Sequence, residues 1–204
     1  MEYQDYVKMQ TVSSLSHEEE KHVWAEGQRR FVRDIIKNLK KEDSILDCAC
    51  GDGIGIEELG RLGFDAIGVD LAEPKLERAR KKNLKVFNSD MHDLSIFADH
   101  QFSVIICSHT LEHAYNPDKV IENFRRILKP GGLLFIVLPF PDLSNNIDVH
   151  IAKDALGTSD EKDGENKLKS FFENRGFSIF EKKFDSYREP EIWLFLKNVS
   201  NGEI

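Results

Sequence analysis

The sequence has few cysteines, no long hydrophobic run and no excess of basic residues. Its three cysteines in 204 residues lack the repeated spacing of a disulfide framework. Cys48 and Cys50 are also too close in sequence for the usual zinc knuckle, so no metal site is predicted. Because Cys48, Cys50 and Cys107 all fall in or beside apolar runs, we expect three buried, reduced thiols, as in a cytoplasmic protein.

The longest apolar run, residues 133–140, has the length of a strand and is too short to cross a bilayer. The N-terminus also lacks the basic start and apolar core of a signal peptide. The net charge is -8, and an acidic surface does not attract a phosphate backbone, so nucleic acid is not an expected partner. We therefore expect one soluble, cytoplasmic domain over residues 1–204 without a membrane span, and leave the oligomeric state open.

The sequence does contain an alternation of short apolar segments with amphipathic ones. Segments typical of helices lie at residues 16–40, 54–62, 74–82 and 116–128, and segments typical of strands at residues 45–49, 66–69, 84–87, 102–108 and 133–138. Strands that are apolar on both faces and alternate with helices indicate a parallel sheet covered on both sides. We predict an α/β fold, a Rossmann-like doubly wound sheet of seven strands with helices on both faces.

The two ends of the chain follow different patterns. A predicted helix at residues 168–175 precedes two strands, 177–184 and 191–197, and the short turn between them predicts a closing antiparallel hairpin. The first dozen residues show no period and are expected to be loose, whereas Ser16 is a suitable N-cap for the helix that follows, with Glu18, Glu19 and Glu20 near its positive end. Residues 142–166 are polar and aperiodic, which predicts a functional or disordered loop.

A glycine loop stands where the first predicted strand turns into a helix. Gly51 and Gly53 let the backbone approach a ligand closely, and the helix N-terminus adds free N–H donors. Asp70 closes the second strand, 19 residues after Gly51, where an acid accepts hydrogen bonds from ribose hydroxyls. Together these features predict a nucleotide site.

The loop does not complete the dinucleotide motif G-x-G-x-x-G. Ile56 stands where the third glycine would be if the motif began at Gly51, and Glu58 stands there if it began at Gly53. The acids Asp47 and Asp52 beside the loop suit a cationic cofactor better than a pyrophosphate. A NAD-dependent oxidoreductase on the same fold is therefore the less favoured hypothesis.

Five segments, in order, resemble the class I S-adenosylmethionine-dependent methyltransferases, specifically the small-molecule type similar to ubiquinone-biosynthesis enzymes. The segments are ILDCACGDG at 45–53, GVD at 68–70, SDMHDL at 89–94, HTLEH at 109–113 and LKPGG at 128–132. The resemblance runs from roughly residue 24 to residue 197. It implies S-adenosylmethionine as cofactor and methyl transfer to an O or N atom of a small molecule. A non-catalytic module that binds the cofactor or its product and acts through a partner is the alternative.

The resemblance also implies a division of the domain and roles for single residues. Residues 1–43 correspond to a helical lid, 44–140 to the cofactor-binding core, and 141–204 to the acceptor-side loop, helix and closing hairpin. The glycine loop contacts the amino-acid end of the cofactor, Asp70 both ribose hydroxyls, Asp90 and Met91 the adenine, and Ser108 lies near the sulfur. The implied cofactor-binding set is Asp47, Ala49, Gly51, Asp52, Gly53, Asp70, Leu71, Asp90, Met91, His92, Ser108 and Arg29.

One departure from the family pattern is visible: Ala49 stands where glycine is usual. A Cβ is tolerated there at negative φ, but it narrows the room beside the cofactor's carboxylate. On the lid helix, Arg29, Arg30 and Arg33 compete to pair with that carboxylate, and a solvated charge is the safer expectation for any one of them.

A hydroxyl acceptor would benefit from a general base, and His113 and His109 are the candidate catalytic residues. For His113, a structural role ranks ahead of a catalytic one, because its ring can bond to Glu112 or to a backbone carbonyl. The same ranking applies to His109. His150 lies in the polar loop and is expected to be solvated.

Overall fold

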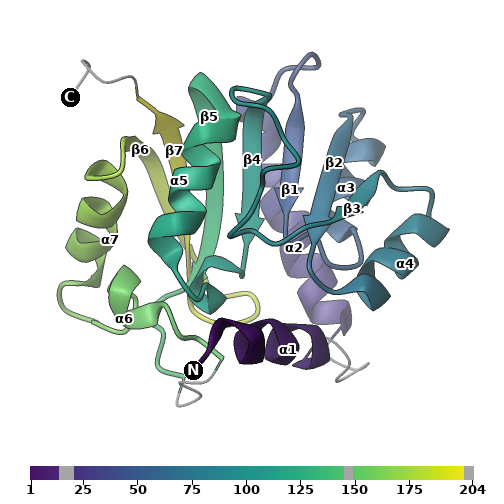
Figure 1. Ribbon diagram of the computed structural model, residues 1–204. Coiled ribbons are helices and arrows are strands. Elements are labelled where there is room, and N and C mark those ends of the chain that lie inside the picture. The colour runs from purple at the N-terminus through teal and green to yellow at the C-terminus, as the bar shows by residue number, and fades with distance from the viewer. Residues whose placement is uncertain (14–20, 145–148, 200–204) are drawn as a thin grey trace.

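The computed structural model describes residues 1–13, 21–144 and 149–199. In this part of the chain, one sheet of seven strands lies between two layers of helices (Figure 1). The strands are β1 (Ile45–Cys48), β2 (Ala66–Asp70), β3 (Val86–Asn88), β4 (Phe102–Ser108), β5 (Leu128–Pro139), β6 (Phe177–Asp185) and β7 (Glu191–Asn198).

The two helical layers follow from two apolar clusters, one on each face of the sheet. Helices α2 (Lys21–Ile35), α3 (Ile54–Arg61) and α4 (Glu73–Lys81) pack on one face. Helices α5 (Pro117–Ile127), α6 (Lys153–Leu156) and α7 (Gly164–Glu173) pack on the other. Neighbouring strand residues divide between the clusters, since Ile45 belongs to the first and Leu46 to the second, as the two-residue period of a strand requires.

The strand order is β3-β2-β1-β4-β5-β7-β6. The first five strands are parallel, and β7 pairs antiparallel with both β5 and β6. The predicted fold, a mostly parallel doubly wound sheet with a closing antiparallel hairpin, is confirmed. The chain moves outward from β1 in one direction through β2 and β3 and in the other through β4 and β5, so a ligand crevice is expected at the carboxyl ends of β1 and β4.

The prediction that the first dozen residues are loose was wrong. Helix α1 (Tyr3–Ser13) lies across the carboxyl ends of the strands (Figure 1). Tyr6 is fully buried, and the rings of Tyr3 and Tyr6 contact His92 and Tyr115. These long-range aromatic contacts stabilise a helix that has no apolar stripe of its own.

Three further segments differ from the sequence prediction. The helix predicted at 16–40 is described from Lys21, and its predicted cap Ser16 and the run Glu18–Glu20 lie outside the described residues. Strand β5 begins at Leu128, before the predicted strand at 133–138, because Leu128 pairs with Phe102 across a bulge. The predicted loop at 142–166 contains α6 and the start of α7, and its Leu156 is fully buried.

The structure also bears on the predictions about the cysteines and about membrane-spanning helices. Cys48, Cys50 and Cys107 are free and buried, as expected, and burial raises the pKa of each thiol. Across the described ranges, no helix is long and apolar enough to cross a membrane.

Candidate functional site

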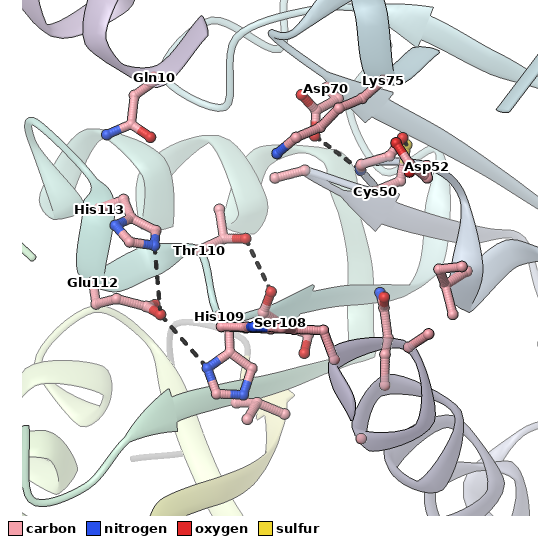
Figure 2. A pocket seen from close by; sticks show the side chains of 18 of the residues that line it. Gln10, Cys50, Asp52, Asp70, Lys75, Ser108, His109, Thr110, Glu112 and His113 are labelled. Atoms are coloured by element: carbon pink, nitrogen blue, oxygen red, sulfur yellow. Dashed lines mark hydrogen bonds and ion pairs between the residues drawn. The ribbon is translucent and has the colours of Figure 1, made fainter. Parts of the chain in front are cut away.

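A cavity of about 750 Å³ opens at the carboxyl ends of the strands, where the crevice is expected. Its walls come from α1, α2, α4, the loops after β1 to β5, and the turn between β6 and β7. Figure 2 shows Asp70, Asp52 and Lys75 on one side and His109, Glu112 and His113 on the other, with Ser108 between them. The predicted residues that line it are Arg29, Ala49, Gly51, Asp52, Asp70, Leu71, Asp90, Met91, Ser108, His109 and His113.

The carboxylate of Asp70 joins two loops at the first side of the cavity. Its Oδ2 accepts a hydrogen bond from the Gly51 backbone N at 2.9 Å, and its Oδ1 accepts one from the Ala72 backbone N at 2.8 Å. A carboxylate oxygen has two lone pairs, so both oxygens keep acceptor capacity for a ligand. Asp70 therefore positions the glycine loop and still offers two acceptors to the cavity.

The backbone of Ala49 has φ of +60°, so the negative φ that would make a Cβ tolerable does not occur. Gly51 at φ +54° and Gly53 at φ +76° share the left-handed conformation, which glycine adopts at no steric cost. For alanine this conformation costs roughly 1–2 kcal/mol. The glycine loop therefore carries backbone strain at Ala49.

We predict that Ala49→Gly stabilises the fold by about 0.5–1 kcal/mol, since relief of the left-handed strain exceeds the added entropy of the unfolded chain. Urea denaturation measures this difference. Ala72→Gly is the matched control, because Ala72 is a loop residue at φ -86° and its replacement should destabilise the protein. An equal loss of stability in both variants would contradict the prediction.

Asp47 lies beneath the loop and does not line the cavity, and its predicted contact with a cofactor stays a prediction. Its side chain is 1% exposed, and its Oδ2 has no hydrogen-bond partner within the described structure. Burial, and secondarily the charge of Asp70, raises the pKa of Asp47 to about 7. Asp47 can affect the site only through the loop above it.

This raised pKa makes the free energy of unfolding depend on pH. Between about pH 4 and 7 the folded state holds the Asp47 proton and the unfolded state releases it, so stability falls as the pH rises. We expect Asp47→Asn to gain stability relative to the parent across this range, on the order of 2–4 kcal/mol. Urea denaturation at several pH values tests this, and a constant difference would refute it.

Asp90 also lines this half of the cavity, and its carboxylate accepts hydrogen bonds from neighbouring protein groups. Its Oδ1 accepts hydrogen bonds from the His92 backbone N at 2.8 Å and Nδ1 at 2.7 Å, and its Oδ2 accepts one from the Tyr3 hydroxyl. Burial alone would raise the pKa of Asp90, but these hydrogen bonds outweigh it and lower the pKa. His92 does not line the cavity, because its ring links Asp90 to the Asn116 backbone N, which donates to Nε2.

Basic side chains also border this half. Arg29 lines the cavity, whereas Arg30 pairs with Asp185 and Arg33 with Glu58. The geometry therefore separates three arginines that sequence analysis left as competitors, although it does not test the predicted role of Arg29. Lys75 reaches from α4 toward the cavity (Figure 2).

The other half of the cavity is polar and enclosed. Glu112 is 1% exposed, its Oε2 has no partner within the described residues, and burial raises its pKa to about 8. Arg188 lies over the Trp24 ring and donates to Nδ1 of His109 at 2.9 Å. The second ring nitrogen of His109, Nε2, lies 2.9 Å from Glu191 Oε2. Helix α2, the segment that follows β4, and the β6–β7 turn thus converge here on several ionisable groups.

Glu112, His113 and His150 each offer a ligand atom within 4.8 Å of one another. The separation of Glu112 Oε1 and His113 Nε2 is 3.9 Å. A tetrahedral site with bonds of about 2.1 Å has edges of about 3.4 Å, so this pair is wider than such a site needs. The expectation of no metal stays a prediction.

A family model described as a methyltransferase domain matches residues 46–136. The ubiquinone biosynthesis O-methyltransferase of Hydrogenovibrio crunogenus is 34% identical over 110 residues, which cover 50% of this chain and 46% of that protein. The match thus spans about half the length of this curated relative. Residues 46–136, somewhat less than half of the chain, are therefore similar to a methyltransferase domain.

Two solved structures share the fold of this chain. An S-adenosylmethionine-dependent methyltransferase from Methanosarcina mazei has a TM-score of 0.64 at 20% identity, covering 81% of this chain and 97% of that one. The [4+2]-cyclase SpnF has a TM-score of 0.68 at 15% identity, covering 85% and 82%. The fold therefore accommodates more than one reaction, and activity has to be argued from the site.

The first half of the cavity fits S-adenosylmethionine, the cofactor that the sequence predicts. Asp70 keeps free lone pairs at the end of β2, where a ribose would need acceptors. The volume also lies within the usual range of small-molecule sites. The placement of each cofactor group remains a prediction.

Gly53 is the third predicted cofactor residue that does not line the cavity. A Cβ there would lie 2.4 Å from Leu84 Cδ1 and 3.3 Å from Ala79 Cβ, so the side of this glycine faces the core. Sequence analysis could not distinguish a glycine needed for packing from one needed for ligand approach.

Several residues that line the cavity carried no signal in the sequence that pointed to the site. Some come from α1, which had no helical signal, and others from the turn between β6 and β7. Glu112 was named only as a possible partner of His113, and His150 was expected to be solvated. The missed residues include Tyr6, Gln10, Lys75, Arg78, Arg188 and Glu191.

Proposed function

We propose that this chain transfers the methyl group of S-adenosylmethionine to an O or N atom of a small molecule. The observation that carries the proposal is one continuous cavity with two chemically different halves. Asp70 and Asp90 lie in the half that fits the cofactor, while Glu112, His150 and Arg188 line a half left for an acceptor.

The residues of the chain act mainly by binding and enclosing. When bound, S-adenosylmethionine supplies an electrophilic methyl group on a sulfonium sulfur. Asp70 would hold the ribose and Asp90 the adenine, so that the sulfur lies near Ser108 between the two halves. Tyr6 and Gln10 of α1 and Trp24 of α2 line the cavity and would exclude water. For an in-line displacement with a good leaving group, alignment of the two reactants supplies most of the rate.

The same geometry supports the proposed division of the single domain. Residues 1–43 would cover the cavity, 44–140 would bind the cofactor, and 141–204 would contribute acceptor-side groups such as His150 and Arg188. The three free, buried cysteines suit a reducing compartment, which favours a cytoplasmic location.

Two measurements test the proposed function. Isothermal titration with S-adenosylmethionine should show binding, and no binding at millimolar cofactor would reject the proposal. Incubation with methyl-labelled cofactor and a metabolite extract should then label a small molecule.

The second candidate function is a non-catalytic module that binds the cofactor and works through a partner. The strained Ala49 in the cofactor loop is the observation that favours it. Binding of the cofactor without transfer to any acceptor would support this alternative.

A further inference from the structure

Three histidines line the acceptor half of the cavity, and their ring nitrogens are engaged differently. In His109, both nitrogens have partners: Nδ1 accepts from Arg188 at 2.9 Å, and Nε2 donates to Glu191 at 2.9 Å. With its lone pair taken by a guanidinium, His109 has no free site for a proton. Burial lowers its pKa further. His109 is thus a structural link between β4 and the β6–β7 turn.

His113 is also a poor proton acceptor. Its Nδ1 donates to the Val149 carbonyl at 2.7 Å, and its Nε2 lies 3.9 Å from Glu112 Oε1. Burial lowers the pKa of His113 to about 4, so the ring stays neutral at physiological pH and has little affinity for a second proton. The bond to a backbone carbonyl is the structural role that sequence analysis ranked first.

His150 is different because a carboxylate holds it. Its Nδ1 lies 2.7 Å from Asp142 Oδ2 and 3.2 Å from Ser144 Oγ. Asp142 is 2% exposed, and its Oδ1 accepts a hydrogen bond from the Ser144 backbone N. Burial alone would raise the pKa of Asp142, but the bonds from His150 and Ser144 outweigh it and lower the pKa. An ionised carboxylate at Nδ1 keeps the proton there.

The consequence is a free lone pair on the second ring nitrogen of His150. Nε2 has no polar partner among the described residues, and the ring lines the cavity. A carboxylate behind an imidazole fixes its tautomer and stabilises the imidazolium that forms when it accepts a proton. Asp142 and His150 thus have the arrangement of a general-base pair at the acceptor half of the cavity.

We propose that His150, oriented by Asp142, is the general base for an acceptor hydroxyl. The inference rests on the proposed methyl transfer and narrows its substrate class. A neutral amine already has a nucleophilic lone pair, whereas a hydroxyl becomes a strong nucleophile only as its proton leaves. An oriented imidazole at this position is therefore of use to a hydroxyl acceptor.

The acceptor O–H bond breaks and its proton passes to Nε2 of His150, while an oxygen electron pair forms the new C–O bond to the methyl carbon. The bond between that carbon and the sulfonium breaks, and its electron pair stays on sulfur, which leaves S-adenosylhomocysteine. The imidazolium proton of His150 then passes to solvent. The products are a methyl ether, the neutral thioether and one released proton.

The charged and titratable groups that face His150 come from three segments. Asp142 lies on its own loop, and the His113 ring packs edge-on at 4.9 Å with Glu112 beside it. The bond between Lys153 Nζ and the Ser144 carbonyl places an ammonium near the same loop. A pH profile of the reaction contains contributions from these groups. The effect of a His150 substitution is therefore measured as the difference in activity between the variant and the parent at each pH.

The test uses the full chain, methyl-labelled S-adenosylmethionine and a metabolite extract, followed by identification of the labelled bond by mass spectrometry. A labelled methoxy group supports the proposal, and transfer exclusively to nitrogen overturns it. Cofactor binding without any transfer rejects the proposed methyl transfer itself, which is a different outcome from transfer that does not depend on His150.

With the labelled acceptor purified, His150→Gln should lower kcat about 100-fold or more while the Kd for S-adenosylmethionine stays within about twofold. Asp142→Asn should lower kcat less and shift the pH profile. His100→Gln is the matched control, since His100 lies outside the cavity and bonds to the Leu128 carbonyl. A purely structural role would instead reduce cofactor binding or thermal stability together with kcat.

A final readout separates a base from a positioning residue. The deficit of His150→Gln should shrink as the pH approaches the pKa of the acceptor hydroxyl, because the ionised acceptor no longer needs a base. A deficit that stays constant with pH overturns the proposal. The proposal is also overturned if EDTA abolishes the activity of the parent, a divalent cation restores it, and the activity of His150→Gln does not depend on that cation.

Discussion

Replacing Asp70 with alanine is expected to weaken S-adenosylmethionine binding at least about tenfold. Hydrogen bonds to a charged group contribute roughly 1.5–3 kcal/mol each, and about 1.4 kcal/mol corresponds to a factor of ten in Kd. Asp70 lines the cavity and keeps acceptor capacity on both oxygens. Isothermal titration with the cofactor and with S-adenosylhomocysteine measures the effect, and unchanged affinity would rule out the ribose role.

Asp70→Ala also removes the acceptors of the Gly51 and Ala72 backbone N–H groups, so part of the loss comes from the loop. A control has to lose a side-chain oxygen that accepts from a backbone N–H without touching the cavity. Asn116→Ala does this, because Asn116 caps α5 by accepting from the Lys119 backbone N at 3.0 Å and does not line the cavity. It should lose about 1 kcal/mol of stability and keep its cofactor affinity. Equal affinity losses in both variants would assign the effect of Asp70→Ala to stability alone.

The parts of the fold that the sequence predicted are those set by local periodicity. Strand β4 is apolar at consecutive positions because helices cover both its faces, and α5 shows its buried stripe at helical spacing. Helix α1 lacks such a pattern, because Tyr3 and Tyr6 bury their rings against His92 and Tyr115. A helix stabilised by contacts far along the chain leaves no local signal.

The candidate site also has one part that local sequence patterns predict and another that depends on contacts far along the chain. Motif spacing led to Asp70 and Asp90, because the carboxyl ends of parallel strands meet at one edge of the sheet. The acceptor half depends on the turn that brings Arg188 to His109 and on the fold of the loop that brings His150 to Asp142. Both contacts depend on loop conformation, which one sequence does not determine.

The packing and backbone conformation of Gly53 favour a structural task for this motif residue, and Gly53→Ala is expected to destabilise the fold by about 2–3 kcal/mol. The backbone at φ +76° costs alanine roughly 1–2 kcal/mol. The added Cβ would also lie 2.4 Å from Leu84 Cδ1, and overpacking of this kind costs about 1–3 kcal/mol. The Leu84 side chain can move at its end, so the lower part of that range applies.

Gly60→Ala is the matched control on the same helix. Gly60 is exposed near the end of α3, and a Cβ there meets nothing within 4 Å. It should gain about 0.5–1 kcal/mol, because alanine is the better helix former. Urea denaturation of both variants gives the comparison, and a stabilised or neutral Gly53→Ala would contradict the role assigned to its backbone and packing.

A double-mutant cycle with Leu84→Ala separates the two costs of Gly53→Ala. Removing the Leu84 side chain should relieve the overlap and leave the backbone strain, so the double variant should be more stable than the sum of the single effects predicts. Because Gly53 lies outside the cavity, the folded variant should bind S-adenosylmethionine with nearly the affinity of the parent. A large loss of affinity with unchanged stability would instead return Gly53 to the cofactor site, beside Gly51.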